Sequence, residues 1–149
     1  MMNILRIVIA IILAGHGLGH IMGFLGTWTS WQPFSEPSFN ESPWIFSDGI
    51  FIHSAVGKVF GIIWLVAMIV FLAAAIGLIA NQSWWSTVAI IACILSLLAV
   101  IPWWNTITPG IMSKKSAVVV DIIILVALLG PWKDVLLTRL SSGKVLFTG

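Results

Sequence analysis

Charged side chains are scarce in this chain of 149 residues, where Asp, Glu, Lys and Arg together make up 8%. Typical globular chains carry about 25% charged residues. Hydrophobic residues make up 60%, so water cannot be the main solvent of the folded protein and an ordinary soluble domain is excluded. Phosphate-binding loops and basic patches for nucleic acid are also missing, which argues against a nucleic-acid partner.

Cysteine occurs once and tyrosine never. A single cysteine, Cys93, can form neither an intramolecular disulfide nor a cysteine-based metal site. It lies inside an apolar run, where we expect it to be a small buried packing residue. Neither Cys93 nor a serine within the apolar runs has a base at a recognisable spacing, so the sequence does not support nucleophilic catalysis and leaves enzyme activity open.

Long apolar stretches account for almost all of the chain. A bilayer core about 30 Å thick requires roughly 20 apolar residues per helix, and the chain supplies that length, or nearly so, four times. Membrane β-strands would alternate apolar and polar residues, whereas residues 62–80 are continuously apolar. We therefore predict an all-α polytopic membrane protein. Its single domain, residues 1–149, is a four-transmembrane-helix bundle with spans at about 3–26, 50–80, 84–101 and 116–132.

Lysine and arginine predict the orientation of this bundle. Basic residues lie near both chain ends, whereas the long first loop, residues 27–49, has none. The residues near the ends are Arg6, Lys133, Arg139 and Lys144. Cytoplasmic segments are enriched in Lys and Arg, so we expect both termini in the cytoplasm and the first loop outside, in a multi-pass protein of the cell (plasma) membrane. Lys114 and Lys115 in the third loop oppose this orientation.

The segment after the fourth span is the basic tail 133–140. We expect it to form a short helix on the inner membrane surface, with Lys133 and Arg139 near anionic head groups. This tail would anchor the end of the bundle at the membrane surface.

Glycine recurs every four residues in the first span, at Gly15, Gly19 and Gly23. This spacing gives a smooth face on which another helix can approach closely. Gly57 and Gly61 offer the same spacing in the second span. We therefore predict that spans one and two pair through these glycines.

Histidine forms a second stripe beside the glycines. His16 and His20 are four residues apart, so their imidazoles leave the same side of the helix about 6 Å apart along its axis. His53, at the start of span two, is expected on the face that meets span one. The three histidines could therefore hold one metal ion, and zinc or copper fits this spacing better than haem. Hydrogen bonding between helices, and proton or substrate handling, are the other roles open to His16 and His20.

Lys58 and Asp121 are ionisable residues within the spans. A charge in hydrocarbon costs about 3 kcal/mol on insertion scales, and such residues usually pair, reach the interface or line a wet cavity. We predict an ion pair between Lys58 and Asp121 that orients spans two and four. With His16, His20 and His53 they would line a semi-polar pocket in the outer half of the bundle, covered by the first loop.

The segment Ala14-Gly15-His16-Gly17-Leu18-Gly19-His20-Ile21-Met22-Gly23-Phe24 resembles the opening helix of small four-span membrane proteins grouped as DoxX-like. The resemblance covers that helix and the number of spans. It implies a four-helix bundle, in a family linked with respiratory or redox membrane complexes, and it carries no catalytic residue over to this chain.

Two functions of different class follow from these observations. The first is a non-catalytic membrane component, either an accessory subunit or a small binding or transport protein whose pocket accepts a ligand, proton or ion. The second is a metal-dependent membrane redox protein or enzyme that uses His16, His20 and His53 as ligands. Four short spans leave little room for a private transport path, so we expect the chain to act in the lipid bilayer as a homo-oligomer or in a larger membrane complex.

Overall fold

The computed structural model describes residues 4–29, 43–45, 50–104 and 114–142. Within these ranges the regular structure is entirely helical, and no strand occurs. The elements in chain order are α1 (Ile4–Gly19), α2 (Ile21–Trp28), α3 (Ala55–Ile79), α4 (Trp85–Val100), the 3₁₀ helix η1 (Ile101–Trp103), α5 (Lys114–Leu129) and α6 (Lys133–Ser142).

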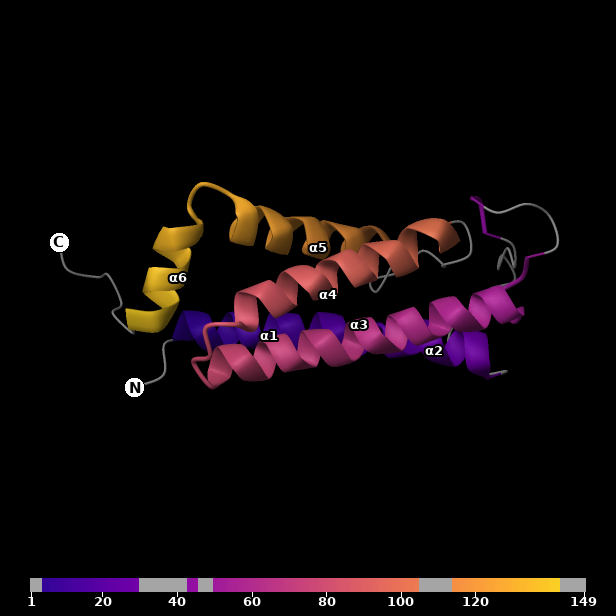
Figure 1. The fold of residues 1–149 in the computed structure, drawn as a ribbon, viewed down its shortest axis with the longest axis horizontal. Helices are drawn as coiled ribbons and strands as arrows, with labels where there is room; N and C mark the ends of the chain where they lie inside the picture. Colours follow the sequence, from indigo (N-terminus) through magenta and orange to yellow (C-terminus); the bar gives the residue numbers. More distant parts are fainter. Residues whose placement is uncertain (1–3, 30–42, 46–49, 105–113, 143–149) are drawn as a thin grey trace.

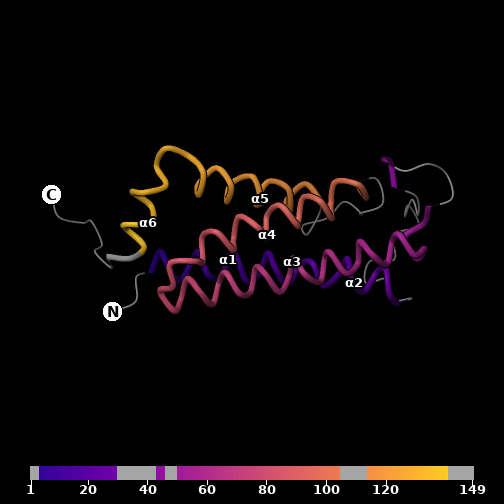
Figure 2. Tube along the Cα trace, viewed as in Figure 1, coloured from indigo at the N-terminus to yellow at the C-terminus, as the bar shows by residue number. Residues whose placement is uncertain are grey.

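The helices before α6 form four rods. These rods run lengthwise, and α6 lies across one end of them (Figure 1). The first rod consists of α1 and α2, and α3, α4 and α5 form the others. α3 packs against both α1–α2 and α4, and α5 packs against α4. The trace in Figure 2 follows the same order, with α3 and α4 joined by a short turn next to the start of α1. The predicted all-helical bundle is confirmed.

Three helical segments in the described residues are long and apolar enough to cross a membrane: Ile4–Trp28, Ala55–Ile79 and Trp85–Trp103. A fourth is obtained if α5 and α6, which are bent by 93° at their junction, are counted as one span. By itself α5 has 16 residues, or about 24 Å of helix. Four apolar helices were predicted, and the described residues contain three to four.

The second apolar helix begins at Ala55, five residues later than predicted. Ser54 caps this helix. Its backbone is extended, and its side-chain hydroxyl accepts a hydrogen bond from the Gly57 amide at 3.2 Å. Such a cap satisfies one of the unpaired amides at the first turn. The helix ends before Asn81, whose positive φ of 57° reverses the chain toward α4.

Small residues bring α3 and α4 into close contact. Ala67, Ala74, Ala89, Ala92 and Cys93 are all completely buried along these two helices. Small side chains allow helix backbones to approach closely and increase dispersion contacts. Cys93 has the buried packing position that its apolar surroundings predict.

Glycines also pack the first rod against α3, but not through the whole predicted stripe. A Cβ at Gly23 would overlap the Trp64 ring, and a Cβ at Gly61 would overlap the Thr27 hydroxyl. Gly57 faces the carbonyl of Ile52, in the segment before its own helix. The predicted pairing of spans one and two is confirmed, and Gly23 and Gly61 are the residues of the two stripes that mediate it.

Gly15 and Gly19 point away from α3. A Cβ built at either residue would meet no atom within 4 Å. The buried face of α1 contains Leu13 and Gly17, and Gly17 lies against Phe71 of α3. Gly15 lies roughly 160° around the helix from Leu13, so the predicted packing role of Gly15 and Gly19 is wrong.

The two described ends of the chain meet at one end of the bundle (Figure 1). The guanidinium of Arg6 donates to the Leu140 carbonyl of α6, with Nε at 3.1 Å, and to the Asn81 side chain at 2.7 Å. Leu140 itself is buried against the bundle. The predicted short helix after the fourth apolar stretch is therefore present as α6, and Arg6 fastens it to α1.

Candidate functional site

A buried carboxylate is the centre of the polar site. Asp121, on α5, is fully buried. Its Oδ1 lies 2.9 Å from His16 Nε2 on α1, and its Oδ2 accepts a hydrogen bond from Ser96 Oγ on α4 at 2.5 Å. The distance to His16 is typical of a hydrogen bond, and the contact with Ser96 is a short one. Asp121 thus joins three helices that are far apart in the sequence.

The face that α5 turns inward explains why Asp121 is sheltered. Asp121 and Leu128 are the buried residues of this helix, and their separation by seven residues places them on the same face. Ile122 and Ile123 point outward and are exposed. An acidic side chain is expected on the inner face, because polar partners are available there.

These contacts lie near the middle of the bundle. His16 is twelve residues from each end of the segment Ile4–Trp28. Asp121 lies seven residues after the first residue of the 16-residue α5. These polar contacts therefore lie at mid-length of the bundle, whereas the sequence predicts a pocket in its outer half.

His20 adds a second imidazole to the site. Its ring is stacked on Phe71, with centroids 5.7 Å apart, and meets the His16 ring edge-on at 5.1 Å. The side chain is buried, with 5% of its surface exposed. Among the described residues, no group hydrogen-bonds to its Nε2 atom. His20 thus brings an unpaired polar atom beside the His16–Asp121 pair.

The backbone at His20 interrupts the first rod. α1 ends at Gly19 and α2 begins at Ile21, and the His20 amide donates to the carbonyl of Gly17, three residues before it, at 3.0 Å. Glycines lower the stability of a regular helix, so a local change of winding is cheap in this segment. The interruption falls within the segment that positions both imidazoles.

Ser96 is a site residue that the sequence interpretation missed, and Cys93 lies near it on α4. They are three residues apart on α4, so they share a face, and both are completely buried. The sequence signal was a pair of small polarisable side chains at helical spacing inside an apolar run. That spacing does not identify Asp121 as the partner of Ser96.

His53 does not join the other histidines. It is exposed, and its Nδ1 lies 3.4 Å from the carbonyl of Thr27. Thr27 is eleven residues beyond His16, or about 16 Å along a helix. Across the parts of the chain that the structure describes, no group of three or more His, Cys, Asp or Glu residues is placed to hold a metal ion. The predicted three-histidine metal site is not formed.

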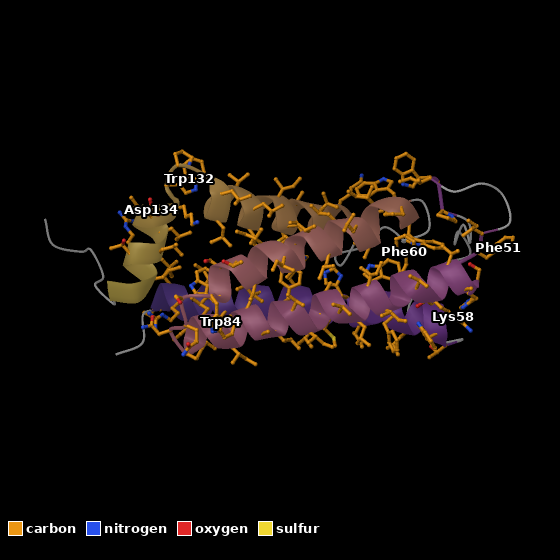
Figure 3. The ribbon with its side chains drawn as sticks, viewed as in Figure 1. Phe51, Lys58, Phe60, Trp84, Trp132 and Asp134 are labelled. Atoms are coloured by element: carbon orange, nitrogen blue, oxygen red, sulfur yellow. The ribbon has the colours of Figure 1, made fainter. Side chains whose placement is uncertain are left out.

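Lys58 does not pair with Asp121. Its side chain is exposed at the end of α3 that lies away from α6 (Figure 3), with Nζ 5.6 Å from the ring centroid of Trp28. Trp28 Nε1 in turn donates to the Lys58 carbonyl at 3.0 Å. Because Lys58 lies in the first turn of α3, its long side chain can reach the end of the bundle and keep its charge there. The predicted ion pair is therefore wrong, and the imidazole of His16 lies beside Asp121 in place of Lys58.

Of the five predicted pocket residues, the structure brings three together: His16, His20 and Asp121. The other two, His53 and Lys58, lie at one end of the bundle. The candidate site is therefore a polar cluster made of these three residues and Ser96, held between α1, α4 and α5.

Comparisons with protein-family models, with curated proteins and with solved structures find no match for this chain. The resemblance of its first helix to DoxX-like proteins stays a prediction.

Proposed function

We propose that this protein is a small four-span component of the plasma membrane, with both termini in the cytoplasm, that holds a proton between His16 and Asp121 in the middle of the bundle. The observation that supports this most directly is the fully buried carboxyl group of Asp121, hydrogen-bonded to an imidazole. Ionisable residues within membrane spans mark proton, ion or substrate pathways by default.

The need to neutralise the buried Asp121 carboxylate implies that the His16–Asp121 pair holds a proton. An isolated carboxylate inside hydrocarbon is costly, so Asp121 must be neutralised, either by its own proton or by protonated His16. The ion-pair contact found for Asp121 among the described residues is with His16, and no lysine or arginine there takes that role. In either arrangement a single proton resides in the hydrogen bond between Nε2 and Oδ1, and the pair as a whole is neutral.

Ser96 fixes the carboxyl group for this role. Its hydroxyl donates to Oδ2, which leaves Oδ1 directed at His16. A hydroxyl donor also stabilises the carboxylate whenever the proton moves to the imidazole. Asp121 can therefore exchange the proton with His16 without losing its second hydrogen bond.

His20 supplies the group through which a proton or a small polar ligand would reach the pair. Its ring contacts that of His16, and its Nε2 has no hydrogen-bond partner among the described residues. A buried polar atom without a partner costs about 1–3 kcal/mol, which an incoming donor or acceptor would relieve. We therefore propose an accessory subunit or a small transport component that works in a homo-oligomer or larger complex.

Nuclear magnetic resonance of imidazole-labelled protein tests this proposal. The chain has three histidines, so their signals can be assigned with single His→Gln variants. As the pH is changed, we expect the His16 signal to report a proton that it shares with Asp121, and Asp121→Asn to change that pH dependence. Asparagine retains hydrogen-bonding atoms on both sides, so the variant should fold.

Asp134→Asn serves as the matched control, because Asp134 is an exposed acidic residue on α6. It should leave the His16 titration unchanged. A His16 titration that is the same in the wild type and in Asp121→Asn would refute the shared proton.

A further inference from the structure

An apolar groove runs along the outward face of α4. It has a volume of about 310 Å³ and is lined by Ile45, Ile94, Leu97, Leu98, Ile101 and Pro102. The five residues from α4 and η1 lie at positions i, i+3, i+4, i+7 and i+8, which belong to one helix face. Leu98 at its centre is 57% exposed, so the protein leaves this face open.

One wall of the groove is Ile45, which belongs to neither α4 nor η1. The residue before it, Trp44, donates a hydrogen bond from Nε1 to the carbonyl of Ile101 at 2.5 Å. This bond fastens the short described segment 43–45 beside the end of η1. The groove is therefore closed on one side by a part of the chain about fifty residues away in sequence, which separates it from the ordinary surface of a helix.

Positive charge lies next to the same end of the groove. Trp104 follows Pro102 by two residues, and Lys114 donates a hydrogen bond to the Trp104 carbonyl. The Lys114 Nζ also lies 5.4 Å from the centroid of the Trp104 ring. Lys115, the next residue, is exposed. Tryptophan and lysine are typical of the head-group layer of a bilayer, and lysine there attracts anionic lipids.

We propose that the groove is the binding site of one anionic phospholipid. An acyl chain lies along Ile94, Leu98 and Ile101, and the phosphate-bearing head group lies at Lys114 and Lys115. The length agrees, because Ile101 follows Ile94 by seven residues, which is a rise of about 10 Å along a helix. One leaflet contributes about 15 Å of hydrocarbon, so the groove holds most of the depth of one acyl chain. This inference does not depend on the proton site, which lies in the interior.

Native mass spectrometry of the detergent-purified protein tests the lipid site. The protein is incubated with equal amounts of phosphatidylglycerol and phosphatidylcholine that carry the same acyl chains. We expect the first bound lipid to be phosphatidylglycerol. Lys114→Gln and Lys115→Gln should each reduce its preference over phosphatidylcholine by about fivefold, the effect of one lysine near an anionic head group. Lys133→Gln, at the opposite end of the bundle, should leave the preference unchanged.

Leu98→Trp tests the groove separately from the charge. Leu98 is already exposed, so a larger side chain there should fill the groove without disturbing the core, and retention of both lipids should fall. Ile123→Trp on the exposed face of α5 is the control and should retain them. Equal preference for the two lipids in the wild type would overturn the proposal. So would equal losses in Lys115→Gln and Lys133→Gln, or equal losses in the two tryptophan variants.

Discussion

Replacing Asp121 with leucine should lower the free energy of unfolding by about 3 kcal/mol, because two buried polar groups, on His16 and Ser96, then lose their partner. His16→Leu should cost about 2 kcal/mol, since Asp121 then keeps the Ser96 hydroxyl but loses the imidazole. The double variant removes both members of the pair and should be about 1.5 kcal/mol more stable than the sum of the single effects predicts. Equilibrium unfolding in detergent measures all three.

Lys58 provides the control for this comparison of single and double variants. Its Nζ lies beside Trp28 at the end of the bundle, so Lys58→Met and Asp121→Leu should have additive effects. The sequence alone predicted the opposite, with Lys58 and Asp121 as partners. Coupling between Lys58 and Asp121, together with additivity between His16 and Asp121, would contradict the structure.

Gly61→Ala should lower the free energy of unfolding by about 2 kcal/mol, as expected for overpacking of a tight helix contact. The added methyl group would overlap the Thr27 hydroxyl and the Trp28 ring. Thr27 cannot easily move away, because it is fully buried and its hydroxyl donates to the carbonyls of Gly23 and Phe24. Thermal unfolding in detergent is a sufficient measurement.

Gly15→Ala is the matched control, because the same methyl group at Gly15 would meet no atom within 4 Å. Alanine stabilises a helix by about 0.8 kcal/mol relative to glycine, so this variant should be equally stable or slightly more stable. If Gly15→Ala destabilised the protein and Gly61→Ala did not, the first rod would be rotated about its axis relative to the structure.

The apolar helices could be predicted from the sequence because hydropathy over about 20 residues depends little on detailed packing. α6 could be predicted as well, because a charged segment after an apolar run must leave the apolar environment. The start of α3 could not be placed to the residue. Residues 50–54 are as apolar as many helical segments, and the cap at Ser54 decides where the helix begins.

The partners inside the bundle could not be predicted in full. The spacing of Gly15, Gly19 and Gly23 shows that they share a face of the helix. It does not show whether that face or the face of His16 and His20 points into the bundle. Similarly, opposite charge suggested Lys58 as the partner of Asp121. Which residue pairs with Asp121 depends on how far each side chain lies from the end of the bundle. A lysine in the first turn of a helix can reach that end, whereas an imidazole at mid-length stays in the interior.

Infrared spectroscopy of the protein in lipid bilayers tests the central claim most directly. Comparing the wild type with Asp121→Asn assigns the bands of the Asp121 carboxyl group, whichever side of the hydrogen bond holds the proton. We predict that His16→Gln shifts these bands and that Lys58→Met leaves them in place. Bands that shift in Lys58→Met but stay in place in His16→Gln would contradict a proton shared by His16 and Asp121.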